Sequence, residues 1–354
     1  MQTRKILILG ASYGSLLGAK LLMAGHTVTL VCLPAEADLI NAQGIRVRMP
    51  VKGREELVEI DSRTLAGSLS AAGPAQVDPA SFDLVALAMQ EPQYGAPSVR
   101  ELMQRVAASR VPCMSIMNMP PLTYLRRLPG VDVDKCRMAY TDPGLWDAFD
   151  PDLMTLCSPD PQAFRPPEED VNVLQVRLPT NFKAARFPSD AHTALLRQLE
   201  DDIAAARLDT ASGPVELPVK LKVFESVFVP LAKWSMLLAG NYRCVQADSV
   251  RPIRDAVHSD LAASRRVYEW VGQVCEAVGA ATADMVPFEK YANAATGLAS
   301  PSSAARALAA GARNIERVDR LVQCVAAQKG MRSAEVDETV RIVDLWLERN
   351  RAKA

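Results

Sequence analysis

The segment Lys5-Ile-Leu-Ile-Leu-Gly10-Ala-Ser-Tyr-Gly14-Ser-Leu-Leu-Gly18 joins an apolar run to a glycine-rich turn and the start of a helix. Such an apolar run is typical of a parallel strand that is buried on both faces. We expect a helix over Ser15 to Met23, ended by Gly25, and a second strand over Thr27 to Cys32. This order of elements indicates a nucleotide-binding βαβ unit.

The turn would hold a dinucleotide pyrophosphate, because unpaired N–H groups and the positive end of the helix dipole favour an anion there. We expect Gly10, Ser12, Tyr13 and Gly14 to contact this cofactor. Ser12 replaces the second glycine of G-x-G-x-x-G and Gly14 comes one position early, so the turn should be one residue short. A tight turn without a ligand is the alternative, but the register of strand, helix and strand favours nucleotide binding.

Bulk properties narrow the classes of function. The 354 residues suggest two domains, which we place at 1–213 and 214–354. A net charge of −1 argues against a nucleic-acid partner. We see no secretory signal and no apolar stretch long enough to cross a membrane, so we expect a soluble, cytoplasmic protein. Seven cysteines without a C-x-x-C pair and three scattered histidines predict no metal site.

The first domain should be α/β, with a Rossmann-type doubly wound parallel sheet. We expect helices over Pro34–Ala42, Pro97–Ala108 and Ser189–Ala206, paired strands within Ile45–Ile60, and strands over Phe82–Met89, Val111–Met117 and Val171–Val176. We expect a surface connection over Ala66–Ala80, irregular structure or an edge insertion over Thr141–Pro167, and a connector over Asp209–Pro218. The second domain should be all helical, with helices over Val219–Val245, Ile253–Val278, Asp284–Ala295, Ser302–Gln328 and Ser333–Arg349.

A lysine in the first of these helices is a candidate for proton transfer. Lys233 lies among apolar residues and forms an i, i+4, i+8 stripe with Leu237 and Asn241. Burial disfavours a charged ammonium, which lets a lysine give or take a proton near neutral pH. The alternative is that Lys233 extends along an amphipathic helix to water, and the helix alone does not decide between the two.

Four features occur in the order and spacing of the ketopantoate reductase (2-dehydropantoate 2-reductase) family, and the resemblance spans most of the chain. They are the turn from Gly10 to Gly18, the strand that ends at Asn118, the Lys233 helix and Pro301-Ser302-Ser303. The resemblance implies a Rossmann domain that binds NADPH and a helical domain similar to the C-terminal domain of 6-phosphogluconate dehydrogenase. It also implies hydride transfer to the 2-oxo carbon of a small carboxylic acid, while a lysine protonates the 2-oxo oxygen.

By this resemblance Lys233 is the general acid, and Asn241, Asn118 and Ser302 orient the substrate. Taken alone, Asn118 could be a turn residue and Ser302 a helix N-cap. Gln90 stands where the family has a lysine, and we expect it to contact substrate and cofactor.

The sequence departs from the family at further positions. Leu237 replaces an inner asparagine of the lysine helix, and counting from Ser302 puts Asn314 at the place of the family carboxylate. Glu316 comes two residues later. A shifted helix could let Glu316 substitute for the carboxylate, but on one helix an offset of two residues points to a different face. These changes predict a substrate larger or less polar than ketopantoate near Leu237 and Gln90.

Cofactor choice rests on the residues after the second strand. Leu33, followed by Pro34, stands where an arginine usually binds the 2′-phosphate of NADP. Glu36 and Asp38 are the nearest carboxylates, and we expect them to be first-turn residues of a helix. The resemblance favours NADP, and NAD stays open.

Other classes of function stay open as well. An opine-dehydrogenase-like enzyme would need a histidine and carboxylate pair, but His258 and Asp260 do not face each other on a helix. A catalytically silent nucleotide sensor, or a relative that has lost dinucleotide binding, would share the fold. We expect a homodimer.

Overall fold

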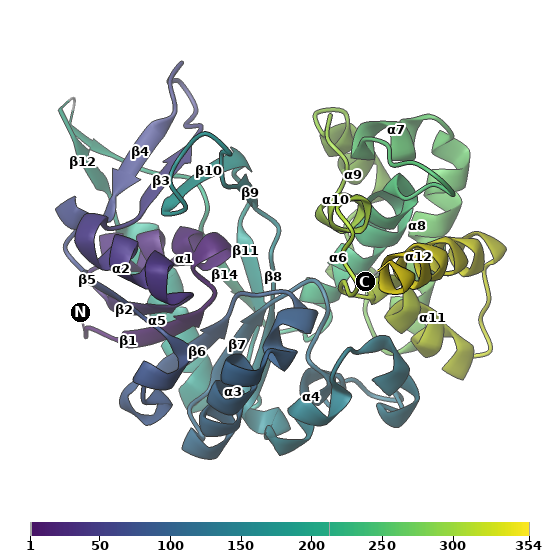
Figure 1. The fold of residues 1–354 in the computed structure, drawn as a ribbon, viewed down its shortest axis with the longest axis horizontal. Helices are drawn as coiled ribbons and strands as arrows, with labels where there is room; N and C mark the ends of the chain where they lie inside the picture. Colours follow the sequence, from purple (N-terminus) through teal and green to yellow (C-terminus); the bar gives the residue numbers. More distant parts are fainter. Residues whose placement is uncertain (1, 212, 354) are drawn as a thin grey trace. The chain divides into compact units, whose positions relative to one another are not determined.

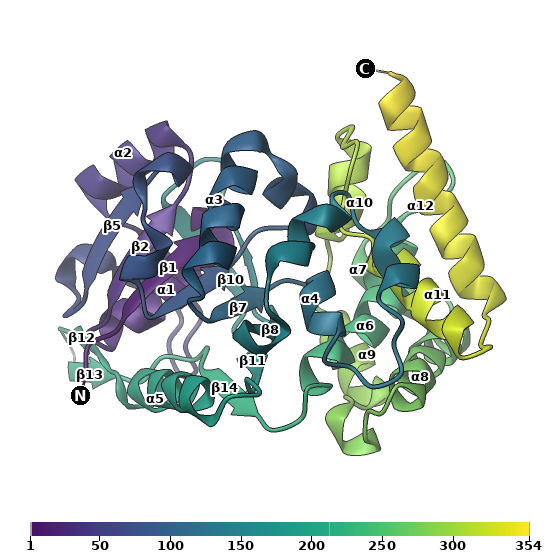
Figure 2. The same ribbon diagram turned by 90° about the horizontal axis from the view of Figure 1, so that it is seen from below.

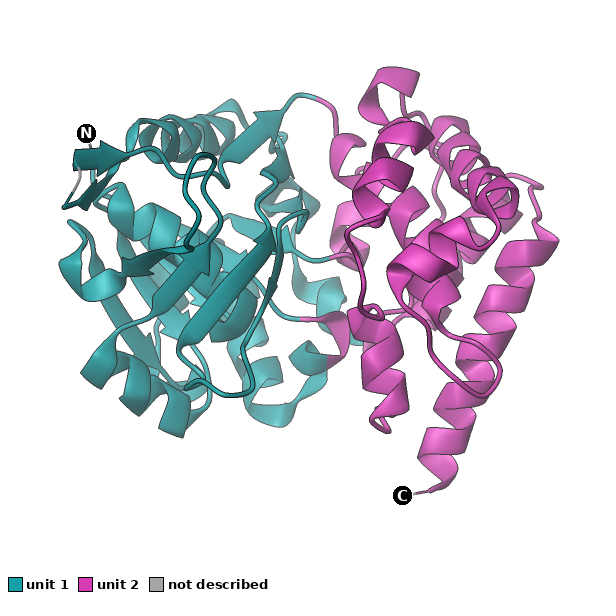
Figure 3. Ribbon diagram, turned by 90° about the horizontal axis from the view of Figure 1, so that it is seen from above, with its two compact units in different colours: residues 1–89, 93–117, 144–225 teal, residues 90–92, 118–143, 226–354 magenta. Residues whose placement is uncertain are grey.

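The chain divides into two compact units in the computed structural model, which describes residues 2–211 and 213–353 (Figure 3). Unit 1 comprises Met1–Met89, Gln93–Met117 and Gly144–Glu225, and unit 2 comprises Gln90–Pro92, Asn118–Pro143 and Ser226–Ala354. The sequence suggested a single boundary between residues 213 and 214. The main part of the helical unit instead starts at Ser226, and residues 90–92 and 118–143 also belong to this unit.

Unit 1 is built on an eight-stranded sheet among the described residues, in the order β14-β11-β8-β7-β6-β1-β2-β5 (Figure 1). The strands are β1 Lys5–Leu9, β2 Thr27–Val31, β5 Ser68–Ala72, β6 Leu84–Leu87, β7 Cys113–Ile116, β8 Met154–Ser158, β11 Phe182–Ala185 and β14 Leu221–Phe224. All neighbours from β5 to β8 pair in parallel, and β11 pairs antiparallel with β8. The strand order reverses between β1 and β6, so the expected doubly wound sheet is confirmed.

Four helices flank this sheet: α1 Ala11–Met23, α2 Pro34–Gln43, α3 Pro97–Ser109 and α5 Asp190–Ala205. Figure 2 shows α3 and α5 on opposite faces. Because helices cover both faces, β1 is buried from Ile6 to Leu9, which explains its unbroken apolar run.

A smaller sheet of unit 1 has the order β4-β3-β10-β9, with β3 Arg46–Met49, β4 Val58–Asp61, β9 Gln162–Phe164 and β10 Val173–Leu178. The antiparallel pair β3 and β4 confirms the strands expected within Ile45–Ile60. A short hairpin joins β12 Leu208–Thr210 to β13 Gly213–Val215.

Three segments expected to lack regular structure contain strands. The stretch Ala66–Ala80 supplies the edge strand β5, whose small polar residues hide its pattern. The stretch Thr141–Pro167 supplies β9 and also β8, which is buried at every position between β7 and β11. The expected connector Asp209–Pro218 contains most of the β12–β13 hairpin. Proline and aspartate beside these strands misled the prediction, since such residues also mark turns that flank strands.

Unit 2 is helical, as expected (Figure 3). Its α-helices are α4 Leu122–Leu125, α6 Lys233–Met236, α7 Ile253–His258, α8 Leu261–Ala277, α9 Phe288–Ala295, α10 Ser303–Ala309, α11 Val318–Gln328 and α12 Ala334–Ala352. No helix in the described part of the chain is both long and apolar enough to span a membrane.

The single helix expected over Val219–Val245 is wrong. This stretch starts with β14, continues as a 3₁₀ turn over Val229–Ala232 and the short α6, and then forms a π-helical turn over Leu237–Asn241. Pro230, which has no N–H to donate, lies in the 3₁₀ turn. The helix expected over Ser302–Gln328 is also interrupted, because residues 312–317 are not helical.

Candidate functional site

The turn after β1 lies where the strand order of the main sheet reverses. Gly10 has a φ of 104°, and a Cβ atom there would lie 2.9 Å from the carbonyl oxygen of Ala88 and 2.6 Å from the side chain of Met89, just past β6. Only glycine fits this position. In doubly wound sheets, ligands bind beyond the carboxyl ends of the strands at this reversal.

The N-terminus of the helix that follows the turn has the features of an anion-binding site. Helix α1 begins directly after Gly10, its N-terminus has no side-chain cap, and its first turn carries no acidic residue. The first N–H groups of a helix need partners from outside it. The chemistry of this turn therefore fits the pyrophosphate of a dinucleotide cofactor, which would be held by backbone N–H groups of α1.

The other residues predicted at this turn differ in their surroundings. Ser12 is exposed at the start of α1, whereas Gly14 is buried, and a Cβ on Gly14 would lie 2.6 Å from the Ile8 side chain. Gly14 thus lets α1 pack closely on β1. Tyr13 donates a hydrogen bond of 2.6 Å to the carbonyl oxygen of Pro161, and burial raises its pKa well above the usual value. Leu33 is 74% exposed at the N-terminus of α2.

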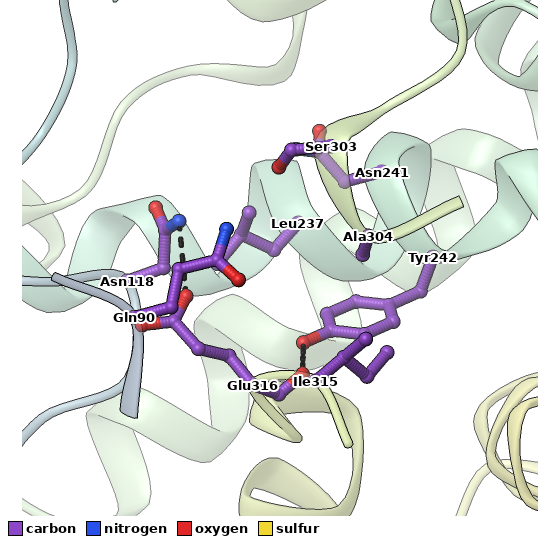
Figure 4. Close-up of a pocket in the computed structure, with 9 residues that line it drawn as sticks. All are labelled: Gln90, Asn118, Leu237, Asn241, Tyr242, Ser303, Ala304, Ile315 and Glu316. Carbon is purple, nitrogen blue, oxygen red and sulfur yellow. Dashed lines mark hydrogen bonds between the residues drawn. The ribbon is translucent and has the colours of Figure 1, made fainter. Parts of the chain in front are cut away.

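A pocket lined by both polar and apolar side chains lies within unit 2 (Figure 4). Its empty volume is about 330 Å³, which includes space open to solvent. Its lining residues are Gln90, Asn118, Leu237, Asn241, Tyr242, Ser303, Ala304, Ile315 and Glu316. The fold thus brings together four of the positions that the sequence singled out, Gln90, Asn118, Leu237 and Asn241, from three separate segments of the chain.

Glu316 is the carboxyl group of this pocket. Its Oε2 accepts a hydrogen bond of 3.3 Å from the Asn118 amide, and its Oε1 accepts one of 3.3 Å from the main-chain N–H of Glu91. Burial raises the pKa of Glu316 to about 7, because desolvation outweighs these hydrogen bonds, which favour the ionised form. A carboxyl group with such a pKa can exchange a proton near neutral pH.

The position of Glu316 depends on Tyr242. The Tyr242 hydroxyl donates to the main-chain oxygen of Glu316 and accepts from the N–H of Val318 at 3.0 Å. These bonds fix the irregular segment 312–317, whose course points Glu316 toward Asn118 (Figure 4). The expectation that Glu316 lies on a different face of a helix is wrong, because no helix is present over this segment.

The π-helical turn that carries Asn241 is supported by an aromatic side chain. The Tyr291 hydroxyl donates to the main-chain oxygen of Met236 at 3.0 Å. It passes so close to Gly240 that a Cβ there would lie 2.0 Å from it. Gly240 therefore admits the group that stabilises this turn, and π-turns often occur at functional sites.

Glu91, which the sequence did not single out, is a second buried carboxyl group beside Glu316. Its Oε1 accepts a hydrogen bond of 3.0 Å from the N–H of Thr141, while its Oε2 is buried without a partner among the described residues. Burial raises its pKa to about 7, and its charge adds to the rise at Glu316. No motif in the sequence points to this pair, because the two residues lie far apart along the chain.

Three predicted residues do not line the pocket. Lys233 is half-buried at the start of α6, one turn before Leu237. Ser302 caps α10, since its Oγ accepts from the N–H of Ala305 at 3.2 Å. The same Oγ donates to the main-chain oxygen of Asn241 at 2.7 Å. Asn314 is exposed, and its side-chain oxygen accepts a hydrogen bond of 2.9 Å from Arg351.

The sheet with its glycine turn and the helical unit define a two-unit, Rossmann-type class of fold. No protein-family model matches the chain, and no curated protein sequence matches it significantly. Solved structures do match, among them a 2-dehydropantoate 2-reductase from Methylococcus capsulatus, at 16% identity, with 98% of this chain and 97% of that chain covered and a TM-score of 0.63.

Two further solved structures match to a similar extent. A ketopantoate reductase from Ralstonia eutropha JMP134 matches at 15% identity, with 98% of this chain and 99% of that chain covered and a TM-score of 0.61. D-mandelate dehydrogenase, solved with NADH and anilino(oxo)acetate, matches at 13% identity, with the same coverage and a TM-score of 0.64. The chain therefore has the fold of the ketopantoate reductases over nearly its whole length, as a divergent example.

Proposed function

We propose that this chain is an NAD(P)-dependent oxidoreductase that reduces a small 2-oxo acid or oxidises the corresponding 2-hydroxy acid. The observation that carries the proposal is the pocket of unit 2, where Asn118, Asn241 and Glu316 converge from three segments of the chain. The glycine turn of unit 1 supports it, since that turn fits a dinucleotide. The neighbours in fold, which include reductases and a dehydrogenase of 2-oxo and 2-hydroxy acids, agree with this activity.

The residues of the pocket have distinct roles in this proposal. The lining residues include no lysine, arginine or histidine, so the polar groups that would orient the substrate are the amides of Asn118 and Asn241 and the Ser303 hydroxyl. Glu316, rather than Asn314, would act as the family carboxylate and accept a hydrogen bond from the substrate. Leu237 and Gln90 would accommodate a substrate larger or less polar than ketopantoate.

Lys233 would be the general acid that protonates the substrate oxygen, or the base in the reverse direction. When bound, the nicotinamide cofactor would supply the hydride for carbon 2. The preference for NADP comes from the family resemblance alone. We also propose a homodimer, in line with the dimeric ketopantoate reductase of Staphylococcus aureus among the neighbours in fold.

The experiment is to mix the purified protein with NADH or NADPH and a panel of 2-oxo acids, and to follow nicotinamide absorbance. We expect turnover, and a loss of roughly 10²–10⁴ in kcat for Lys233→Met, because a general acid contributes about this much. Lys290→Met, which removes an exposed lysine of α9, is the control and should keep kcat. Cofactor binding without turnover would support a silent sensor instead, and full activity of Lys233→Met would refute the role of Lys233.

A further inference from the structure

An ion pair lies in unit 1 near the end of β2, where the adenosine ribose of a dinucleotide is read in sheets of this kind. The sequence offers no charged residue directly after β2, since Leu33 and Pro34 follow Cys32. Glu36, in the first turn of α2, pairs through its Oε1 with Nη2 of Arg165, a residue that follows β9. The arginine thus arrives from a part of the chain far from β2.

The pair is partly buried, and it is next to the strand end. The side chains of Glu36 and Arg165 are 14% and 27% exposed. Burial raises the pKa of the Cys32 thiol to about 12, and the charges of Glu36 and Arg165 act on that thiol in opposite directions. Cys32 comes directly after β2, so both charges lie within electrostatic reach of the strand end.

The segment that carries Arg165 is fastened at several points. Asp160 forms an ion pair of 2.8 Å with Lys183, and the Tyr13 hydroxyl donates to the oxygen of Pro161 at 2.6 Å. Strand β9 then pairs with β10. Arg165 is therefore presented by ordered backbone, and Tyr13 of the nucleotide turn is one of the residues that hold this backbone in place.

We infer that the Glu36–Arg165 pair recognises the 2′ position of the adenosine ribose and makes the protein prefer NADH to NADPH, contrary to the NADP preference that the family resemblance implies. This inference rests on the proposed function. Oε1 of Glu36 is held by Arg165, and Oε2 would accept a hydrogen bond from a ribose 2′-hydroxyl. A 2′-phosphate would bring its negative charge against this carboxylate, and like charges across an interface disfavour binding. Arg165 is engaged by Glu36 and offsets this repulsion only in part.

The test is to measure the dissociation constants of NADH and NADPH by nicotinamide fluorescence, with 5′-AMP and 2′,5′-ADP as probes that lack nicotinamide. We expect the wild-type protein to bind NADH at least about tenfold more tightly than NADPH. Glu36→Gln should reduce this preference about tenfold, because it removes the repelling charge. Arg165→Gln should increase the preference, because the carboxylate then loses its compensating cation.

Asp38→Asn is the matched control, since it removes the same charge from an exposed position of the same helix. It should leave the preference unchanged, and circular dichroism should show that all variants are folded. A wild-type preference for NADPH, or equal preferences in all three variants, would overturn the inference and leave the proposed function standing. Failure of the folded wild-type protein to bind either dinucleotide would overturn both.

Discussion

The nucleotide turn of unit 1 and the pocket of unit 2 are built in opposite ways. The turn is made of backbone, because Gly10 and the uncapped start of α1 follow from a local run of sequence. The pocket is made of side chains, because Glu316 is held by Asn118, Tyr242 and the main chain at Glu91, which come from distant segments. A site of the first kind can be read from a motif, whereas one of the second kind exists only after folding.

The largest expected effect tests whether the turn depends on backbone alone. Gly10→Ala should abolish nucleotide binding and lower the free energy of unfolding of unit 1 by roughly 2–4 kcal/mol, through strain at positive φ and overlap with Ala88. Gly53→Ala is the control, because Gly53 also has positive φ but no atom lies within 4 Å of the place that its Cβ would take. Urea unfolding and nucleotide titration measure both effects. Equal behaviour of the two variants would show that contact with Ala88 is unimportant.

The second effect is a difference in pH dependence between the units. In unit 2 the pKa values of Glu91 and Glu316 are raised from 4.5 to about 7, so between these values the folded state binds more protons than the unfolded state. Stability of unit 2 should therefore fall as pH rises from 4.5 to 7. In unit 1, burial lowers the pKa of Lys20 from 10.5 to about 7, so between these values the unfolded state binds more protons than the folded state. Stability of unit 1 should therefore rise as pH increases from about 7 to 10.5.

At 1.36 kcal/mol per pKa unit, the free energy of unfolding should change by about 3 kcal/mol for each carboxyl group of unit 2 and by about 5 kcal/mol for Lys20 in unit 1. Urea titration at several pH values, with pulsed labelling of the buried Cys113 in unit 1 and Cys275 in unit 2, would separate the units. Glu316→Gln should reduce the dependence of the free energy of unfolding on pH in unit 2, and Lys20→Met should reduce it in unit 1. Parallel slopes in both units would contradict the assignment of these groups.

The third effect tests whether the pocket depends on the Tyr242 hydroxyl. Tyr242→Phe removes both hydrogen bonds that fix the backbone around Glu316, which should cost about 1–2 kcal/mol of stability and raise KM about tenfold. Tyr268→Phe, which loses a hydrogen bond of 2.8 Å to the main-chain oxygen of Val286 in unit 2, should cost stability and leave the contacts of Glu316 intact. Steady-state kinetics with urea unfolding would distinguish them. An unchanged KM in Tyr242→Phe would remove the hydroxyl from this role.

The smallest effect separates a structural serine from a pocket serine. Ser302→Ala should lower the free energy of unfolding by about 1 kcal/mol, because it removes the cap of α10, and should change KM little. Ser303→Ala should do the reverse, since Ser303 lines the pocket and the N-cap is untouched. A large rise of KM in Ser302→Ala, with stability retained, would restore the substrate role suggested by the family.

The sequence predicted those parts of the fold whose signal is local. Strand β1, helix α1 and strand β2 follow from an apolar run, a glycine turn and a second apolar run, and all are present near their expected bounds. Strand β8 escaped detection although it is fully buried, since prolines and aspartates surround it. The π-helical turn could not be foreseen, because it depends on the Tyr291 hydroxyl packing against Gly240.

In the candidate site, too, the sequence predicted some residues and missed others. Asn118 and Asn241 were found because a family resemblance marks them, and both line the pocket. Glu316 was set aside because a continuous helix was assumed, and Arg165 carries no signal at all, since its partner Glu36 is distant in sequence. Pairings between distant segments are fixed by packing, which a local pattern does not encode.

The route of the chain between its two units limits how the gene could be recombined. The chain passes from one unit to the other after Met89, Pro92, Met117, Pro143 and Glu225. A helical unit cut out as one continuous carboxy-terminal piece would therefore lack Asn118 and Glu91, and with them the groups that hold Glu316. In a chimaera that exchanges only this piece, Glu316 would face the amino-terminal segments of a different protein, so functional chimaeras should exchange residues 90–92 and 118–143 together with it.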